Sequence, residues 1–227
     1  MIIVDSVQEF LTWFNESNSS SDDEKITSFM TRVYTQDPAF YEFRFKGIKD
    51  RNESIDSKIL ALFSEFGSFQ QRFIAFHTTI KNTIQKGLKQ LHSMFPEFEI
   101  DIPIHICHSL GECDGATRFL DNQDVLVLGI DVMAQVHTWD NEIPFIQHEL
   151  FHIYHLRLYP HVTESFYHED TIARGLWIEG LAVYISYLLN PQATKAELLL
   201  DTPPQLIEET KKRTTIAPRS LPRRPRK

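Results

Sequence analysis

Three features of the sequence predict an α+β fold that is mostly helical and contains a small mixed or antiparallel sheet. Apolar residues recur at helical spacing through much of residues 1–97. Between residues 99 and 130 the period changes to two, which is typical of strands. Two further helical patterns follow, at about 141–158 and 169–189. We expect the sheet to pack beside the first of these two helices.

The chain has 227 residues, of which 42% are hydrophobic, so it is long enough to bury a sizeable core. We expect a helical part over 1–97, a second part over 98–200, and a short helix with a disordered basic tail over 201–227. No apolar run reaches the length of a membrane span, and the start lacks a basic segment. These features predict a soluble, cytoplasmic protein without a membrane partner.

The two cysteines, Cys107 and Cys113, are too few for a disulfide framework and suit a reducing compartment. Charge is uneven along the chain. Residues 211–227 hold eight of the 23 basic residues and no acidic one, so the first 210 residues carry 15 basic and 31 acidic residues. This acidic body argues against nucleic-acid binding by the domain. The oligomeric state is not predicted.

Four helical segments are predicted in the N-terminal part, with a polar linker between the first and the second. The segments are Val4–Phe14, Glu24–Tyr34, Ser54–Phe66 and Phe69–Phe95, with a linker at Asn15–Asp23. The last segment repeats apolar residues every three or four positions, which indicates a stripe that packs in the core. A cofactor groove along its phenylalanines is the less favoured interpretation.

Two strands are predicted in the region of period two. Glu99–Ile106 alternates isoleucines with polar residues and is expected to be half-buried, with Pro103 favouring an edge or terminal position. Asp124–Ile130 is the second strand. Gly111–Ala116 between them is rich in turn-forming residues, so we expect a loop there.

A His-Glu-x-x-His motif lies at residues 148–152, inside the predicted helix at 141–158. Asn141 can cap this helix and Pro144 fits its first turn. Four residues are about one helical turn, so His148 and His152 project from one face and can share a metal ion. Glu149 lies beside them, where a carboxylate can take a proton from a metal-bound water.

A catalytic zinc site needs a third protein ligand. His155 is seven residues from His148, about 10 Å along the helix axis, and cannot reach the same ion. Glu179 is the better candidate because its helical neighbours are apolar, and a carboxylate buried among them would need a partner such as a metal ion. Gly180 would let this helix approach another backbone closely.

These residues resemble a family. His-Glu-x-x-His at 148–152, followed by Trp-Ile-Glu-Gly-Leu-Ala-Val-Tyr at 177–184, is similar to the gluzincin group of zinc metallopeptidases, above all to small predicted zinc-dependent proteases with a Glu-Gly-Leu-Ala signature. The resemblance covers roughly residues 98–190 and implies one Zn²⁺ held by His148, His152 and Glu179, with Glu149 as the general base. Many gluzincins have an Asp four residues after the ligand glutamate, where this chain has Val183.

The resemblance also implies a strand that pairs with the substrate backbone, which we assign to Val125–Ile130, with Val125, Val127 and Gly129 as contact positions. Candidates for an oxyanion donor or a second-shell group are four aromatic side chains near the motifs: His155, His161, His168 and Tyr184.

The expected function is a zinc-dependent peptidase that acts on a peptide or protein substrate. Two alternatives use the same residues. One is a metal-dependent hydrolase of a non-peptide substrate, and the other is a binding module in which zinc locks two helices together without turnover.

Overall fold

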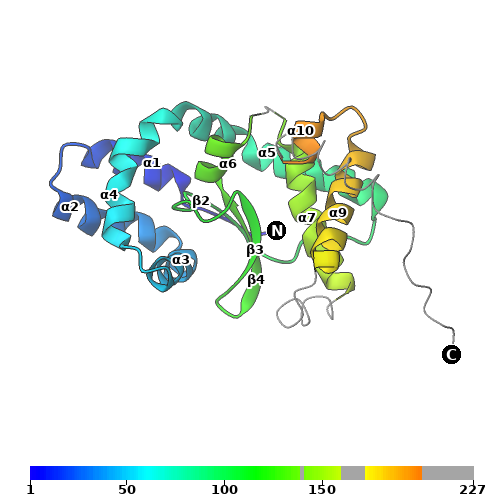
Figure 1. Cartoon of the computed structure of the whole chain (residues 1–227), viewed down its shortest axis with the longest axis horizontal. Coiled ribbons are helices and arrows are strands. Elements are labelled where there is room, and N and C mark those ends of the chain that lie inside the picture. Colours follow the sequence, from blue (N-terminus) through cyan, green and yellow to red (C-terminus); the bar gives the residue numbers. More distant parts are fainter. Residues whose placement is uncertain (139–140, 160–171, 201–227) are drawn as a thin grey trace, which may run out of the picture.

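The computed structural model describes residues 1–138, 141–159 and 172–200, and a four-stranded mixed sheet lies at its centre (Figure 1). The strands are β1 (Ile3–Asp5), β2 (Ile104–Cys107), β3 (Gly115–Leu120) and β4 (Gln123–Gly129), in the order β1-β2-β4-β3. β1, β2 and β4 run parallel, and β3 is antiparallel to β4. The predicted class, a mostly helical α+β fold with a small mixed sheet, is confirmed.

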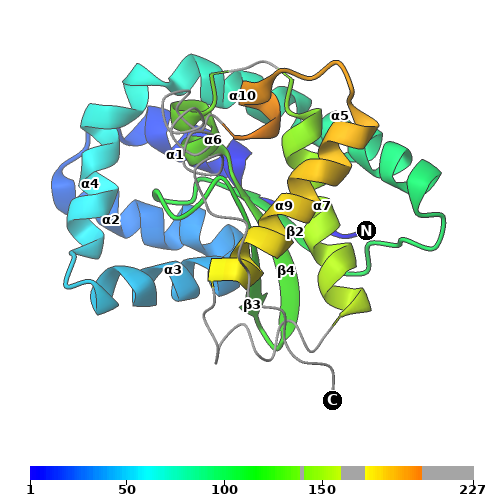
Figure 2. The ribbon, with the colours of Figure 1, turned by 45° about the vertical axis from the view of Figure 1, so that its right-hand side comes forward.

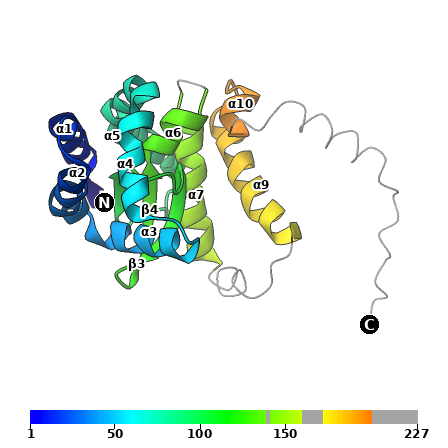
Figure 3. The same cartoon turned by 60° about the vertical axis from the view of Figure 1, so that its left-hand side comes forward.

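Helices surround this sheet. They are α1 (Val7–Ser17), α2 (Asp22–Ser28), α3 (Pro38–Asp50), α4 (Ile55–Glu65), α5 (Gln70–Met94), α6 (Ile130–Val136), α7 (Ile143–Leu158), α9 (Ile172–Leu189) and α10 (Lys195–Leu198), with a π-helical turn η1 (Phe29–Val33) and 3₁₀ turns η2 (Tyr34–Gln36) and η3 (Phe66–Ser68). Figure 3 shows α7 beside the sheet and α9 on the outer side of α7. No helix among these described ranges has both the length and the apolar character needed to cross a membrane.

The core is continuous from the N-terminal helices to α7. In α5 the predicted stripe is buried, and its residues Phe73, Phe76, Ile80, Ile84 and Leu91 belong to the same hydrophobic cluster as the strands. Phe10 and Trp13 of α1 pack against the aromatic rings of η3 and α4. Because β1 joins β2, the parts on either side of residue 97 share one sheet and one core.

The expectations for the first 50 residues need three corrections. Val4 does not begin a helix, because Ile3–Asp5 pair with Ile104–Ile106 and α1 starts only at Val7. The predicted linker at 15–23 is shorter, since α1 runs to Ser17 and α2 begins after a capping box made by Ser21 and Glu24.

The third correction is α3, which was not predicted. Asp37 caps it by accepting a hydrogen bond from the Phe40 backbone N–H at 3.2 Å, and Pro38 occupies its first turn. Its apolar face supplies Phe40, Tyr41 and Ile48 to the core.

The region of period two also differs from expectation. The first strand is shorter than Glu99–Ile106, and it is fully buried rather than half-buried because both of its faces are covered. Ile104 and Ile106 belong to the hydrophobic core, and His105 on the other face lies 2.7 Å from the buried Asp37 carboxylate. Pro103 directly precedes this strand, in agreement with its expected terminal position. β3 was not predicted at all; it begins where a loop alone had been expected.

The β3–β4 hairpin is closed by a two-residue turn. Asp121 and Asn122 have positive φ angles of 47° and 63°, and Leu120 pairs with Gln123 across them. Such a turn matches the twist of antiparallel strands, and Asp and Asn tolerate this backbone region better than most residues. The hairpin therefore places β3 at the open edge of the sheet, next to α7.

The loop between β2 and β3 is held by a buried carboxylate of α6. Asp131 accepts hydrogen bonds from the backbone N–H groups of Ser109 (2.6 Å) and Gly111 (2.9 Å). Gly129 allows the loop to pass close to β4, because a Cβ at this position would lie 1.9 Å from the Cys113 carbonyl oxygen. These contacts fix where β3 begins.

Candidate metal site

α7 carries the His-Glu-x-x-His motif through the interior of the molecule. Its first turn contains Pro144, and the Asn141 side chain accepts a hydrogen bond from the Ile143 N–H at 3.4 Å, close to the predicted cap. The helix has apolar residues on several faces, and α5, β3 and α9 pack against these faces. His148 and Glu149 are consequently only 3% and 6% exposed.

α9 lies along the outer side of α7 (Figure 2). The Glu179 side chain of α9 contacts both His148 and His152. The contact between the helices is apolar at Ile178 and Ala182, which are buried. One polar contact is buried as well: the Ser186 hydroxyl donates to the Pro144 carbonyl at 2.9 Å. The helix predicted at 169–189 corresponds to α9, which is described from Ile172 to Leu189. Residues 169–171 lie outside the described part of the chain.

Three ligand atoms converge between α7 and α9. The Nε2 atoms of His148 and His152 are 2.9 Å apart, and Oε2 of Glu179 lies 3.1 Å from the first and 3.4 Å from the second. Neighbouring ligand atoms around a tetrahedral ion with bonds of about 2.0–2.1 Å are roughly 3.3 Å apart, so the triangle has the size that such an ion requires. The predicted residues His148, His152 and Glu179 thus form a group that can hold a metal ion.

The electrostatics of the group fit a cation. Hydrogen bonds from His148 and His152 hold the pKa of Glu179 well below its usual range. Burial acts to lower the pKa of His152, but the hydrogen bond with Glu179 and the charges of Glu149 and Glu179 outweigh it and raise that pKa. Two imidazole nitrogens that face each other beside a carboxylate form a typical donor set for a transition-metal ion.

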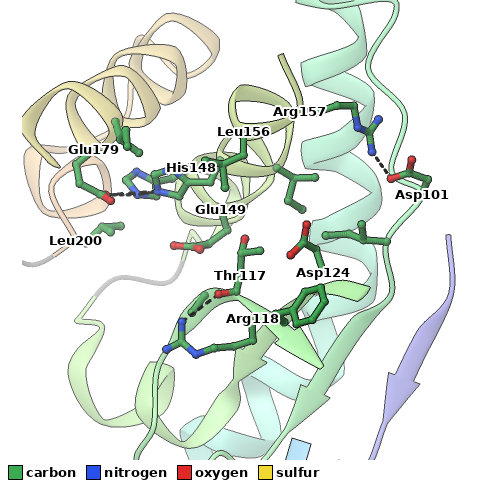
Figure 4. Close-up of a pocket in the computed structure, with 17 residues that line it drawn as sticks. Asp101, Thr117, Arg118, Asp124, His148, Glu149, Leu156, Arg157, Glu179 and Leu200 are labelled. Atoms are coloured by element: carbon green, nitrogen blue, oxygen red, sulfur yellow. Dashed lines mark hydrogen bonds and ion pairs between the residues drawn. The ribbon is translucent and has the colours of Figure 1, made fainter. Parts of the chain in front are cut away.

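Glu149 lies next to the group without belonging to it, on the side that faces β3 (Figure 4). Burial raises the pKa of its carboxyl, and the nearby His148 and His152 offset part of that rise. Its proton affinity therefore exceeds that of a solvent-exposed glutamate, which is a useful property in a base.

Gly115, the first residue of β3, makes this position of Glu149 possible. A Cβ at Gly115 would lie 2.7 Å from both Cγ and Cδ of Glu149 and 2.8 Å from Cζ of Phe145. Only glycine lets the strand approach the helix so closely. Just before Gly115, the Asp114 carboxylate is 3.0 Å from Nε2 of the buried His137, whose ring lies against Phe145. These contacts join β3, the segment that carries His137, and α7 beside Glu149.

The substrate-strand prediction is wrong. Val125, Val127 and Gly129 lie in β4, which is paired with β2 on one side and with β3 on the other. An internal strand has no free edge with which to bind a peptide backbone. The edge strand next to Glu149 is β3, at Gly115–Leu120.

A cavity of about 740 Å³ opens beside the metal ligands. Figure 4 shows that α7 and α9 form one wall, with His148, Glu149 and Glu179 directed inward, and that β3 forms the opposite wall with Thr117. The cavity continues past the ligands toward Asp124 and Arg157. A molecule bound there would contact both the ligand group and the open strand edge.

The candidate second-shell residues do not gather at this cavity within the described ranges. His155 is buried, with its ring stacked on Phe151 and edge-on to Tyr159. Tyr184 is 54% exposed and does not line the cavity. His161 and His168 lie outside the described residues. The buried Nδ1 of His148 has no hydrogen-bond partner in the described part of the chain, so the group that orients this histidine is not among those residues.

Two details around Glu179 differ from expectation. Its side chain is 59% exposed rather than buried in an apolar stripe, because it borders the open cavity instead of the core. The neighbouring Leu176 is 70% exposed. A Cβ at Gly180 would meet nothing within 4 Å, so this glycine does not serve a close helix contact.

Sequence reasoning missed Gly115, the strand that it begins, and the Asp114–His137 pair. One signal could have revealed β3: an Asp-Asn pair at 121–122 between two runs of strand-forming residues is typical of a tight hairpin. The pairing of Asp114 with His137 spans 23 residues and has no comparable local signal.

Comparisons with protein families, with curated proteins and with solved structures found no match to this chain. The function is therefore inferred from the residues and their geometry.

Proposed function

We propose that this protein is a zinc-dependent peptidase of the gluzincin type. The observation that carries the proposal is the convergence of His148 Nε2, His152 Nε2 and Glu179 Oε2 at 2.9–3.4 Å, with the Glu149 carboxylate beside them. Two imidazoles and one carboxylate are the ligands of a common class of catalytic zinc site. The resemblance of the two sequence motifs to gluzincins agrees with this arrangement.

A bound zinc ion would supply Lewis acidity, which polarises a carbonyl group and makes water acidic enough to act as a nucleophile at neutral pH. His148, His152 and Glu179 would hold that ion. Glu149 is placed to take a proton from the attacking water and to return one to the leaving amine. The burial of Glu149 limits the access of bulk water to this proton.

The open edge of β3 supports a peptide as the substrate class. Its outward backbone groups have no strand partner in the described part of the chain, so an extended peptide can add to the sheet there and run past Glu149. Main-chain pairing would bind peptides of many sequences. This strand replaces Val125–Ile130 in the proposal and gives the non-peptide hydrolase less support.

A zinc-locked binding module without turnover is also less favoured. That alternative requires a site closed to other molecules. Here the Glu179 side chain is 59% exposed, and the cavity reaches both histidines.

The experiment is Glu149→Gln in the full chain, assayed with a library of internally quenched peptides after zinc loading. We expect zinc to remain bound and hydrolysis to fall by about 10²–10⁴-fold, the usual contribution of a general base. Glu65→Gln, on the exposed surface of α4, is the matched control and should keep full activity. An unchanged rate in Glu149→Gln would refute the assigned base, and the absence of hydrolysis by zinc-loaded wild type would refute the peptidase.

A further inference from the structure

The cavity has a second end that the proposed chemistry does not use. Beyond the ligand group it runs along α7, where it is lined by Ile102, Ile153 and Leu156. These three apolar side chains make a channel wall without hydrogen-bonding groups. Asp124, at the start of β4, lies at the end of this channel and points into it (Figure 4).

Sheet register places Asp124 on the face that lies under α7. Asp124 pairs with Phe119 across the hairpin, and residues at alternate positions of a strand share a face. Thr117 and Gly115 therefore lie on the same face as Asp124, and Gly115 contacts Glu149 on α7. One face of the hairpin thus connects the base to Asp124.

Asp124 is the carboxylate without a partner at this end of the cavity. Arg157 is held by the Asp101 carboxylate and donates to the Glu99 carbonyl at 2.6 Å. Arg118 is directed to the other face of the sheet, where it donates to Glu112 at 3.2 Å. The Asp124 side chain is exposed and makes no hydrogen bond or ion pair with the described residues, so its charge is free to meet a ligand.

A second unpartnered polar group lies beside it. The Thr117 hydroxyl oxygen is buried and has no hydrogen-bond partner among the described residues. In Figure 4 it lies between Glu149 and Asp124. A buried hydroxyl without a partner is costly, and a donor brought by a ligand would remove that cost.

From these features we infer that Asp124 selects substrates with a lysine or arginine side chain, an inference that rests on the proposed peptidase function. A peptide added to the edge of β3 lies two strand spacings from β4, about 10 Å. Long cationic side chains span such a distance, and shorter ones do not. Their methylene stems fit against Ile153 and Leu156 of α7, while the charged end meets Asp124. Asp124 is thus a specificity-determining residue.

The test measures binding separately from hydrolysis. Glu149→Gln protein loaded with zinc is titrated into fluorescent peptides that are identical except for one central residue, either arginine or citrulline. Citrulline keeps the length and shape of arginine and lacks its charge. We expect the arginine peptide to bind about fivefold or more tightly, in line with one hydrogen bond to a charged group.

Asp124→Asn in the same background should reduce this preference to less than twofold, and Asp124→Lys should favour a glutamate peptide. Asp121→Asn is the matched control: it removes the same charge from the neighbouring hairpin turn, where asparagine tolerates the positive φ of 47°, and it should keep the arginine preference.

Equal binding of the arginine and citrulline peptides, a preference that survives Asp124→Asn, or no binding of either peptide would overturn the assignment. The peptidase proposal is tested separately, by cleavage with the wild-type protein. Selective binding without cleavage would refute the peptidase and leave Asp124 as a recognition residue. Cleavage without preference for arginine or lysine would refute only the role of Asp124.

Discussion

The two helices that hold the ligand group differ in how the rest of the molecule supports them. α7 packs against α5, β3 and α9, and most of its side chains are buried. α9 packs mainly on α7 and the short α10, and its outer face exposes large apolar side chains, among them Trp177 and Tyr187. The difference teaches that His148, Glu149 and His152 lie on a helix that is anchored in the core, whereas Glu179 depends on one helix-to-helix contact.

The largest effect that would test this comparison is a loss of core volume in α7. Phe145 is fully buried and contacts His137, so Phe145→Ala should lower the free energy of unfolding by about 3–5 kcal/mol. Trp177 in α9 is 62% exposed, and Trp177→Ala should change the same quantity by no more than about 0.5 kcal/mol. Chemical denaturation measures both. Similar losses in the two variants would show that α9 is supported as firmly as α7.

Glycine substitutions compare the same two regions at the backbone. Gly115→Ala forces Glu149 or Phe145 to move, because both lie under 3 Å from the added Cβ, and should cost about 1–3 kcal/mol together with most of the peptidase activity. Gly180→Ala in α9 meets no neighbour and should stabilise the protein by up to about 1 kcal/mol. Denaturation curves measure the change in stability of both variants, and activity assays measure the loss of peptide hydrolysis. A harmless Gly115→Ala would show that β3 does not need its close approach to α7.

A buried hydrogen bond between α7 and α9 predicts a smaller effect. Ser186→Ala removes the hydrogen bond to the Pro144 carbonyl and should cost about 1 kcal/mol. Because this bond helps to fix α9 against α7, zinc affinity should fall with it, although no ligand is changed. An unaltered zinc dissociation constant would mean that Glu179 is positioned by other contacts.

Acid sensitivity is expected on the side of the molecule where β1 meets α5. Partial burial acts to raise the pKa of Asp5, but hydrogen bonds from His77 and Lys81 outweigh it and lower that pKa to about 2, from an ordinary value of 3.8. The carboxylate therefore adds stability above about pH 4, and this stability is lost as pH falls toward 2. Asp5→Asn should cost on the order of 1 kcal/mol at neutral pH, after allowance for solvent screening, and should flatten stability between pH 4 and 2. Urea midpoints across that range provide the measurement.

Elements that depend on local sequence patterns were predicted correctly, whereas elements that depend on pairing between distant residues were not. α4, α5 and α7 were predicted within a few residues, because caps and apolar stripes are local signals. β1 was taken for a helix because its strand partner lies 100 residues later in the chain. The position of β4 inside the sheet depends on β3, which was missed.

The site shows the same division. His148, Glu149 and His152 share one helix, so their spacing fixes their geometry, and Glu179 was predicted from the apolar residues at helical spacing around it. The exposure of Glu179 and the contact of Gly115 with Glu149 depend on how separate elements pack. Periodicity within one element contains no information about such contacts.

Metal content tests the central claim most directly. Wild type, Glu179→Ala and the surface control Glu65→Ala are purified without a metal-affinity tag and analysed for bound zinc, before and after zinc is added back. We predict one zinc ion per chain in wild type and in Glu65→Ala, with binding sharply weaker in Glu179→Ala. Wild type that binds no zinc after reconstitution, or Glu179→Ala that binds zinc as tightly as wild type, would contradict the three-ligand site.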